Sequence, residues 1–312
     1  MFARRPVPDA WTRGSRGAVA RGSRIAAAGY HPRVLLLVDL DGVVYRGSEA
    51  VPGVPAVLAA RVAAGDDVVY VTNNSMFYRT AYTERIAGHG APVGDDRVIT
   101  SARATALYLR EHQPGVRRVL VVGASGLERE MRDIGLEVVA AAHAATRSAQ
   151  EGIDGFEAAG RPDAVVVGLD PQLTYGRIGV AADAIRAGAL FIATNRDATY
   201  PTERGLNPGA GSVVAAIEVA AQTPPIAEIG KPGPLLLEEA AKAVGQVAAD
   251  AVMIGDALTD IAAARAVGAR SVLILTGVTT AERAAAIPEG ERPTFVAADA
   301  AALAAILEQL AG

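Results

Sequence analysis

The sequence contains no cysteine among its 312 residues. This absence excludes disulfide bonds, thiolate nucleophiles and zinc sites built from cysteine. Long apolar runs are also missing, and none approaches the length that a membrane-spanning helix needs. We therefore expect no membrane partner, and a cytoplasmic location is the expectation that fits a chain without cysteine.

An excess of basic residues is missing as well. The formal net charge is −4, which argues against nucleic acid as the main partner. Apolar residues make up 51% of the chain and charged residues 21%, which is the composition of a globular protein. The length is sufficient for a large core and allows two domains.

Lysine is scarce, because only Lys231 and Lys242 occur among the 30 basic residues. Arginine supplies all the other cationic side chains, so a retained lysine is a candidate for a specific role. Lys231 directly precedes Pro232 in a Gly/Pro-rich stretch, which is an unusual setting for an ordinary surface lysine.

The first 33 residues differ from the rest of the chain. They contain seven arginines and one acid, Asp9, and they show no apolar periodicity. Arg4 and Arg5 are not followed by the apolar segment of a secretory signal, so secretion is not expected. We predict a flexible, arginine-rich tail over residues 1–33.

Residues 34–38 are five apolar residues in a row, which predicts a strand buried on both faces. The strand runs directly into two acids, Asp39 and Asp41. Residues two apart in an extended chain point the same way, and the carboxyl end of a parallel strand is where ligands bind. Two like charges this close repel unless a cation or a shared proton offsets them, so the pair indicates Mg²⁺, acid–base chemistry, or both.

Strands and helices alternate through the rest of the chain. This alternation predicts an α/β fold with a doubly wound parallel sheet of the Rossmann-like kind. The alternation restarts near residue 102 and continues to a Gly/Pro-rich segment that begins at residue 205. We therefore predict a catalytic core formed by residues 34–101 and 206–312, and an inserted α/β cap domain over residues 102–205.

If the predicted strands are all parallel in one sheet, their carboxyl ends lie on one edge, and four polar stretches should meet there. They are Asp39 with Asp41, Thr72-Asn73-Asn74, Lys231, and Asp256 with Asp260. Carboxylates favour Mg²⁺ over zinc, whereas a hydroxyl, backbone amides and a lysine together suit a phosphate. A carboxylate nucleophile with a second acid beside it suits an aspartyl-phosphate route.

These stretches resemble the four motifs of the haloacid dehalogenase superfamily, in the same order: Asp39-x-Asp41-Gly42, Thr72-Asn73, Lys231-Pro232, and Gly255-Asp256 with Asp260. Within the superfamily the chain is similar to the phosphatase branch with an α/β cap of the C2 type between the second and third motifs. That branch includes p-nitrophenyl, phosphoglycolate and glycerol-3-phosphate phosphatases. The stretches typical of the branch are residues 71–75, 167–170, 193–197, 208–212, 230–234 and 275–278.

The resemblance implies a role for each acid. Asp39 would be the nucleophile and a Mg²⁺ ligand. Asp41 would protonate the leaving oxygen and then activate water, with its backbone carbonyl on the metal. Asp256 would complete the metal site. Asp260 has two candidate roles, in the metal site or beside Lys231, because it lies four residues after Asp256 where the branch usually has five.

The resemblance also implies how the substrate is bound. Thr72, Asn73 and Asn74 would contact it at its phosphoryl group, and Lys231 would neutralise the charge between Asp39 and the phosphate. Substrate selection would fall to the cap, whose substrate-facing edge should include Leu169, Asn195 and Tyr200, together with Asp170, Arg196, Asp197 and Pro201.

We therefore expect a Mg²⁺-dependent phosphoric monoester hydrolase that acts on a small molecule. A phosphomutase or phosphotransferase of the same superfamily is one alternative, and a catalytically idle protein that binds phosphometabolites is another. A dehalogenase is disfavoured, because dehalogenases of the superfamily lack the acid present here as Asp41. The substrate and the oligomeric state stay open, with a homodimer through the cap as one option.

Overall fold

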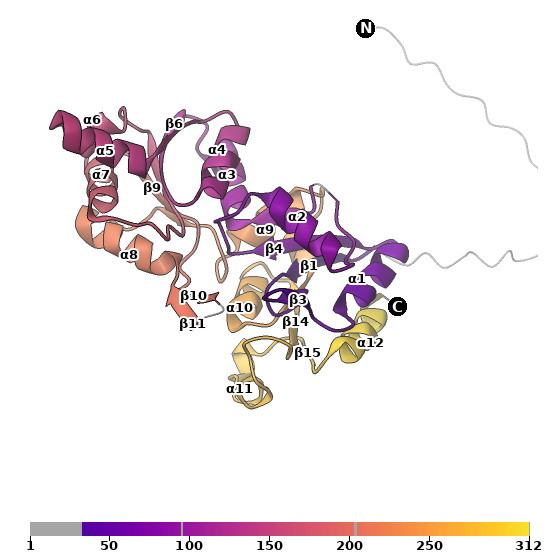
Figure 1. The fold of residues 1–312 in the computed structure, drawn as a ribbon. Helices are drawn as coiled ribbons and strands as arrows, with labels where there is room; N and C mark the ends of the chain where they lie inside the picture. Colours follow the sequence, from indigo (N-terminus) through magenta and orange to yellow (C-terminus); the bar gives the residue numbers. More distant parts are fainter. Residues whose placement is uncertain (1–32, 95, 203–204, 312) are drawn as a thin grey trace, which may run out of the picture. The chain divides into compact units, whose positions relative to one another are not determined.

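The computed structural model describes residues 33–94, 96–202 and 205–311 (Figure 1). The predicted arginine-rich tail over residues 1–33 lies outside the described residues except for Arg33. The side chain of Arg33 is exposed, and its Nε lies 3.1 Å from the carboxylate of Asp67.

A six-stranded sheet carries the acids that the sequence singles out. All its strands are parallel, in the order β15-β14-β13-β1-β4-β5, so the first strand of the chain lies between β13 and β4. The strands are β1 (Leu35–Asp39), β4 (Asp67–Thr72), β5 (Val98–Thr100), β13 (Val252–Gly255), β14 (Arg270–Ile274) and β15 (Phe295–Ala297).

Helices cover both faces of this sheet. Leu36 and Val38 of β1 pack on one face, and Leu35 and Leu37 pack on the other, because successive side chains of a strand alternate. The helices over the first face are α1 (Val54–Ala63), α2 (Arg79–Gly88) and α12 (Ala300–Ala311). Those over the second are α3 (Ser101–His112), α9 (Leu235–Lys242) and α10 (Leu258–Ala266). The doubly wound α/β fold predicted from the sequence is confirmed.

A second parallel sheet has five strands in the order β12-β9-β8-β6-β7. The strands are β6 (Arg118–Val122), β7 (Glu137–Ala140), β8 (Ala164–Val167), β9 (Leu190–Ala193) and β12 (Ala227–Glu228). The helices of this part are α4 (Ser125–Asp133), α5 (Ala141–Glu151), α6 (Gly155–Ala158), α7 (Tyr175–Arg186) and α8 (Ala210–Ala221).

The second sheet draws on residues beyond the predicted cap of 102–205. Helix α8 places Val213, Val214 and Ile217 in the same buried cluster as β8 and β9, and β12 pairs with β9. The two are separated from α7 and β9 in sequence by the antiparallel hairpin of β10 (Thr199–Thr202) and β11 (Gly205–Pro208). The division into core and cap stays a prediction, and the chain leaves the second sheet only after β12.

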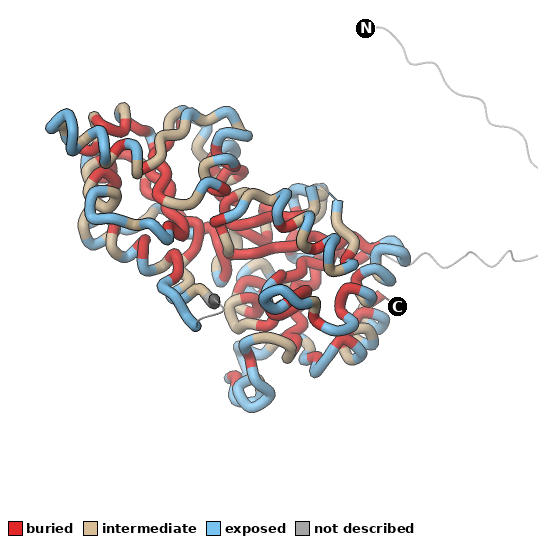
Figure 2. Tube along the Cα trace, in the orientation of Figure 1, coloured by how far each residue is buried: buried red, intermediate tan, exposed pale blue. Residues whose placement is uncertain are grey.

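One hydrophobic cluster joins the two sheets. It contains Val69 of β4, Leu109 of α3 and Val119 of β6, and α3 packs against both α4 and α9. Buried segments, red in Figure 2, run through the strands of both sheets. Within the described ranges, no helix combines the length and apolar character that crossing a bilayer requires.

Candidate active site

The two acids at the end of β1 face one pocket but differ in burial. Asp39 is the last residue of β1 and is 8% exposed, whereas Asp41 lies in the following turn and is exposed. The turn needs glycine, because Gly42 has a φ of 81° and its N–H donates to the Tyr45 carbonyl at 2.8 Å. Both carboxylates line the pocket, as their spacing of two residues predicts.

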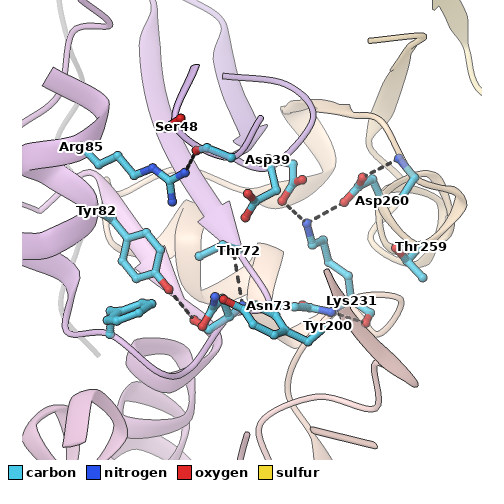
Figure 3. A pocket seen from close by; sticks show the side chains of 15 residues that line it. Asp39, Ser48, Thr72, Asn73, Tyr82, Arg85, Tyr200, Lys231, Thr259 and Asp260 are labelled. Atoms are coloured by element: carbon cyan, nitrogen blue, oxygen red, sulfur yellow. Dashed lines mark hydrogen bonds and ion pairs between the residues drawn. The ribbon is translucent and has the colours of Figure 1, made fainter. Parts of the chain in front are cut away.

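Lys231 lies between two carboxylates. Its Nζ is 2.5 Å from Oδ1 of Asp39 and 2.6 Å from Oδ1 of Asp260 (Figure 3). Burial lowers the pKa of Lys231, but the carboxylates of Asp260 and Asp39 raise it above its ordinary value. The side chain therefore stays a charged ammonium although it is buried.

The acids that follow β13 are fixed by backbone amides. Oδ2 of Asp256 accepts a hydrogen bond from the Val278 N–H at 2.7 Å, and Oδ2 of Asp260 accepts one from the Ala257 N–H at 3.0 Å. The second bond places a carboxylate at the start of α10, where the helix dipole favours negative charge. Asp260 thus contacts Lys231 and caps a helix, which accounts for its burial.

Glycine leaves the space that Asp256 occupies. A Cβ added to Gly42 would lie 2.6 Å from the carboxyl carbon of Asp256, and a Cβ on Gly277 would collide with the same side chain. The Cβ on Gly277 would lie closer still to the same carboxyl carbon. Both distances are shorter than any real carbon–carbon contact, so an alanine at either position would displace the carboxylate. Two loops that are far apart in sequence are therefore shaped around this acid.

Three of these acids form a group suited to a metal ion. Asp39, Asp256 and Asp260 each offer an oxygen atom within 4.8 Å of the others, and all three are buried. Lys231 supplies one positive charge against three negative ones. Burial, followed by the charge of Asp260, raises the pKa of Asp256 to about 6, and burial also raises the pKa of Asp39.

An excess of buried negative charge is stabilised by a cation, and a donor set of oxygen atoms alone fits Mg²⁺. The residues present therefore fit the metal that the sequence predicts. The carboxylate of Asp41 is not part of the group of three. The contact expected between a metal and the backbone carbonyl of Asp41 stays a prediction.

The pKa of Asp41 is raised above its ordinary value. Desolvation by the surrounding protein raises it, although the residue is exposed to the open pocket, and the charges of Arg85 and Lys231 oppose that rise. The net direction is upward, so Asp41 keeps its proton at a higher pH than an ordinary aspartate. A residue that donates a proton and later takes one back needs such a pKa.

The side chain of Asn73 holds the loop that carries Lys231. Its Oδ1 accepts from the Lys231 N–H at 2.8 Å, and its Nδ2 donates to the Lys231 carbonyl at 2.9 Å. Nδ2 also donates to both carboxylate oxygens of Asp197, at 3.0 and 3.1 Å. All the polar atoms of this side chain therefore bind protein groups, and any contact of Asn73 with a phosphate falls to its backbone.

Asn195 is placed behind the pocket. The side chain is 3% exposed, and its Nδ2 donates to the Asn73 carbonyl at 2.7 Å. Its Oδ1 accepts from the Asp197 N–H at 3.0 Å, which fixes the turn that brings Asp197 to Asn73. Asn195 does not line the pocket, so the structure shows it supporting Asn73, and its predicted contact with substrate stays a prediction.

Thr72 and Asn74 flank Asn73 and both line the pocket. Thr72 ends β4, and its Oγ1 accepts from the Asn74 N–H at 3.2 Å. The Oδ1 of Asn74 in turn accepts from the Met76 N–H at 2.9 Å. These bonds form a tight turn at the carboxyl end of β4, beside β1, where the sequence predicts the phosphate site.

The two apolar residues predicted from the cap have different positions. Tyr200 on β10 lines the pocket, whereas Leu169 is 7% exposed and does not. Leu169 packs with Met76 and Ala210, and Tyr200 packs against this cluster. The Leu169 N–H donates to Oγ of Ser75 at 3.3 Å. Leu169 therefore supports the pocket wall, and its predicted substrate contact stays a prediction.

The pocket encloses about 820 Å³ and includes residues that sequence reasoning missed. The missed side chains are Ser48, Phe77, Tyr82 and Arg85. Ser48 lies in the turn between β2 (Tyr45–Arg46) and β3 (Glu49–Ala50), and Tyr82 and Arg85 lie on α2. No motif marks these segments, although the three-residue spacing of Tyr82 and Arg85 puts both on one face of a helix.

Comparisons with known proteins agree with this site. Residues 36–137 match a family model described as haloacid dehalogenase-like hydrolase, and residues 228–303 match one described as HAD-hydrolase-like. An acid sugar phosphatase from Staphylococcus aureus is 34% identical over 247 residues, which cover 79% of this chain and 88% of that protein.

Solved structures give the same result. A p-nitrophenyl phosphatase from Archaeoglobus fulgidus superposes with a TM-score of 0.77 at 29% identity, over 88% of this chain and 99% of that chain. A glycerol phosphate phosphatase from Mycobacterium tuberculosis, solved in complex with calcium, gives a TM-score of 0.73 at 36% identity, over 86% of this chain and 74% of that chain. The same enzyme was also solved with magnesium.

The predicted superfamily motifs and the curated relatives thus agree. The acids, the lysine and the Thr-Asn pair lie together around one pocket. We conclude that the chain belongs to the haloacid dehalogenase-like hydrolases and, within them, to the phosphatases.

Proposed function

We propose that this protein hydrolyses small phosphomonoesters with Mg²⁺, through a phospho-aspartate on Asp39 and with Asp41 as general acid and base. The observation that supports this most directly is the ammonium of Lys231, 2.5 Å from Asp39 and 2.6 Å from Asp260 inside a buried acid group. The arrangement offers an attacking oxygen and a positive charge at one place, which is what phosphoryl transfer needs.

In the first half of the reaction, a carboxylate oxygen of Asp39 attacks the phosphorus atom. The bond from phosphorus to the ester oxygen breaks, and that oxygen takes the proton of the Asp41 carboxyl group. Lys231 lowers the pKa of Asp39 against the effect of burial and neutralises the phosphoryl oxygens. The leaving alcohol departs neutral, and Asp41 is left as a carboxylate.

In the second half, Asp41 takes a proton from a water molecule, whose oxygen attacks the phosphorus of the phospho-aspartate. The acyl phosphate bond breaks, inorganic phosphate is released, and Asp39 returns to a carboxylate. The hydroxyl of Thr72 and the backbone N–H of Asn73 bind phosphoryl oxygens throughout, while the Asn74 N–H donates to Thr72 Oγ1 at 3.2 Å. Asn73 contributes no side-chain contact, because its amide holds the Lys231 backbone.

The cation would be held by Asp39, Asp256 and Asp260, with the backbone carbonyl of Asp41. When bound, it supplies positive charge that offsets the repulsion between a carboxylate nucleophile and a dianionic phosphate. The cap side of the pocket, including Tyr200, would contact the rest of the substrate. A homodimer through the cap and a cytoplasmic location stay predictions.

The test is hydrolysis of p-nitrophenyl phosphate with added Mg²⁺, followed by release of inorganic phosphate. We expect turnover that EDTA removes and that Asp39→Asn abolishes, because the amide is nearly isosteric but not nucleophilic. Asp299→Asn, which changes an exposed carboxylate outside the pocket, is the matched control. If a panel of sugar, glycerol and glycolate phosphates gave no phosphate release, the proposal would be wrong.

The same assay separates the alternatives. A phosphomutase or phosphotransferase would form the phospho-aspartate but pass the phosphoryl group to a second hydroxyl, so little inorganic phosphate would appear. An idle binding protein would show saturable binding of phosphate esters and no turnover. The presence of all the acids around Lys231 favours the hydrolase over the idle protein.

A further inference from the structure

One side of the pocket has no role in the proposed reaction. Ser48, Phe77, Tyr82 and Arg85 line it, and Figure 3 draws Arg85 and Tyr82 on the opposite side of Asp39 from Lys231 and Asp260. The phosphoryl group lies where Asp39 can attack it, beside Lys231. The side that contains Arg85 is therefore free for the remainder of the substrate.

Arg85 is also close to the group that meets the leaving oxygen. Both side chains line the pocket, and Arg85 stacks on the ring of Tyr45, whose backbone forms a β-bridge with Asp41. After burial, the positive charge of Arg85 is accordingly the first influence on the pKa of Asp41. Because Asp41 delivers its proton to the ester oxygen, a cation beside Asp41 faces the alcohol portion of the substrate. Lys231 is the second influence and faces the phosphoryl portion.

The charge of Arg85 is not matched by an ion pair with a described carboxylate. Among the ion pairs formed by described residues none involves Arg85, whereas Lys231 contacts two carboxylates. The guanidinium carbon lies 3.7 Å from the centre of the Tyr45 ring, and Nη2 donates to the Gly47 carbonyl. Stacking and one backbone bond hold the group in place, and Nε and Nη1 make no hydrogen bond with the described residues.

Nη2 has a second N–H besides the one on Gly47, and together with Nε or Nη1 it offers the paired donors that match a carboxylate or phosphate. The neighbouring surface is aromatic. Phe77 is 51% exposed, and its ring packs edge to face against that of Tyr82, with 6.2 Å between the ring centres. This side of the pocket therefore combines one cation, apolar ring surface and the Ser48 hydroxyl. It suits a small organic group that carries a second anion.

We propose that Arg85 determines specificity by binding a second anionic group on the alcohol portion of the substrate, so that the preferred substrates are phosphomonoesters of acidic alcohols. The inference rests on the proposed hydrolysis. The second anion is a carboxylate or a second phosphate, because the guanidinium recognises both by the same paired hydrogen bonds.

The experiment compares esters that differ only in this charge. 3-Phosphoglycerate and glycerol 3-phosphate share one carbon skeleton, and a carboxylate in the first replaces a neutral hydroxymethyl group in the second. Fructose 1,6-bisphosphate and fructose 6-phosphate form the corresponding pair for a second phosphate. The readout is the ratio of kcat/KM for the acidic ester to kcat/KM for its neutral partner, measured by phosphate release.

For the wild type we expect a ratio above one in at least one pair, and that pair identifies the anion. Arg85→Gln should lower this ratio by about ten- to a hundredfold, the effect of losing a charge-assisted hydrogen bond. Arg85→Lys keeps the charge and should retain most of the ratio. Arg46→Gln is the control, because Arg46 is exposed on the same hairpin as Ser48 and does not line the pocket.

The possible failures are distinguishable. If the wild type hydrolyses no ester, the proposed function fails. If it hydrolyses the esters but favours the neutral member of both pairs, the role of Arg85 is overturned and the function stands. The role of Arg85 is likewise overturned if Arg85→Gln lowers kcat/KM equally for the acidic and the neutral ester. Turnover of the neutral ester by each variant shows that it is folded, and the wild-type ratios remain decisive if Arg85→Gln does not fold.

Discussion

Asn73 offers the sharpest test of how the site is held together. The sequence places it among the phosphate ligands, whereas the structure uses its side chain to join three segments of the chain. Replacing it by alanine removes both hydrogen bonds to the Lys231 backbone and the bonds to Asp197. The backbone carbonyl of residue 73 keeps its bonds from Ser101 and Asn195, so the loss is confined to the amide.

The expected magnitude follows from what is left behind. The Lys231 N–H is buried, and leaving such a donor without an acceptor costs about 1–3 kcal/mol. The bond to the half-buried carboxylate of Asp197 adds a similar amount, since hydrogen bonds to charged groups contribute about 1.5–3 kcal/mol. We expect Asn73→Ala to lower the free energy of unfolding by about 3–5 kcal/mol, which is large for one substitution.

Activity should fall for the same reason. A displaced Lys231 no longer lies between Asp39 and the phosphate, and a misplacement of about 1 Å costs about a hundredfold in rate. The fall should appear in kcat more than in KM. Urea unfolding followed by circular dichroism measures stability, and p-nitrophenyl phosphate hydrolysis measures the rate. Asn74→Ala, which removes one local hydrogen bond, is the control and should cost about 1 kcal/mol.

One result would refute this reasoning. If Asn73→Ala kept wild-type stability and raised KM while kcat stayed the same, the amide would bind the phosphate directly. The hydrogen bonds to Lys231 and Asp197 would then be incidental to the fold.

Three further predictions concern the acids and the cap. Asp41→Asn should release about one equivalent of p-nitrophenolate and then stall. This leaving group needs little protonation, so the first half of the reaction proceeds, whereas the attack of water in the second half still needs the base. Rapid-mixing absorbance measures the burst. In EDTA, the raised pKa of Asp256 means that the folded state binds more protons than the unfolded state between pH 4 and pH 6. The wild type should therefore lose up to about 3 kcal/mol relative to Asp256→Asn as pH rises across that window, and urea titrations with no such difference would contradict the shift. Gly126→Ala should destabilise the protein by about 2 kcal/mol or more, because a Cβ there would lie 2.6 Å from the Tyr78 nitrogen. The control is Gly179→Ala in α7, where a Cβ would meet open space and should stabilise the helix slightly. Thermal melting measures both variants.

The sequence was sufficient to predict the centre of the site. Asp39 and Asp256 lie at the carboxyl ends of apolar strands of one parallel sheet, and parallel strands bring such positions to one edge whatever the helices do. Lys231 reaches the same pocket from β12 of the second sheet, so this rule accounts for the acids and not for the lysine. The predicted group therefore depended on local pattern and on one topological rule. The structure adds which atoms are in contact, above all that Nζ of Lys231 contacts both Asp39 and Asp260.

Other features depend on tertiary packing that no local pattern encodes. Helix α8 has an apolar face that would suit either sheet, so its place on the second sheet could not be read from Val213 or Ile217. Arg85 is held at the pocket by the Gly47 carbonyl, 38 positions earlier in the chain, and by the Tyr45 ring. The use of the Asn73 amide by the Lys231 loop is likewise a contact between residues 158 positions apart.

The short strand β12 has a consequence for attempts to rebuild this enzyme. It pairs with β9 in the second sheet, and the chain reaches Lys231 three residues later. The nucleophile and the lysine are therefore delivered by different sheets. Excising the insertion to obtain a minimal phosphatase, or transplanting it from a relative to change substrates, would alter the bond network that aims the lysine. Successful chimeras should keep Asn73, Asp197 and residues 227–231 from one parent.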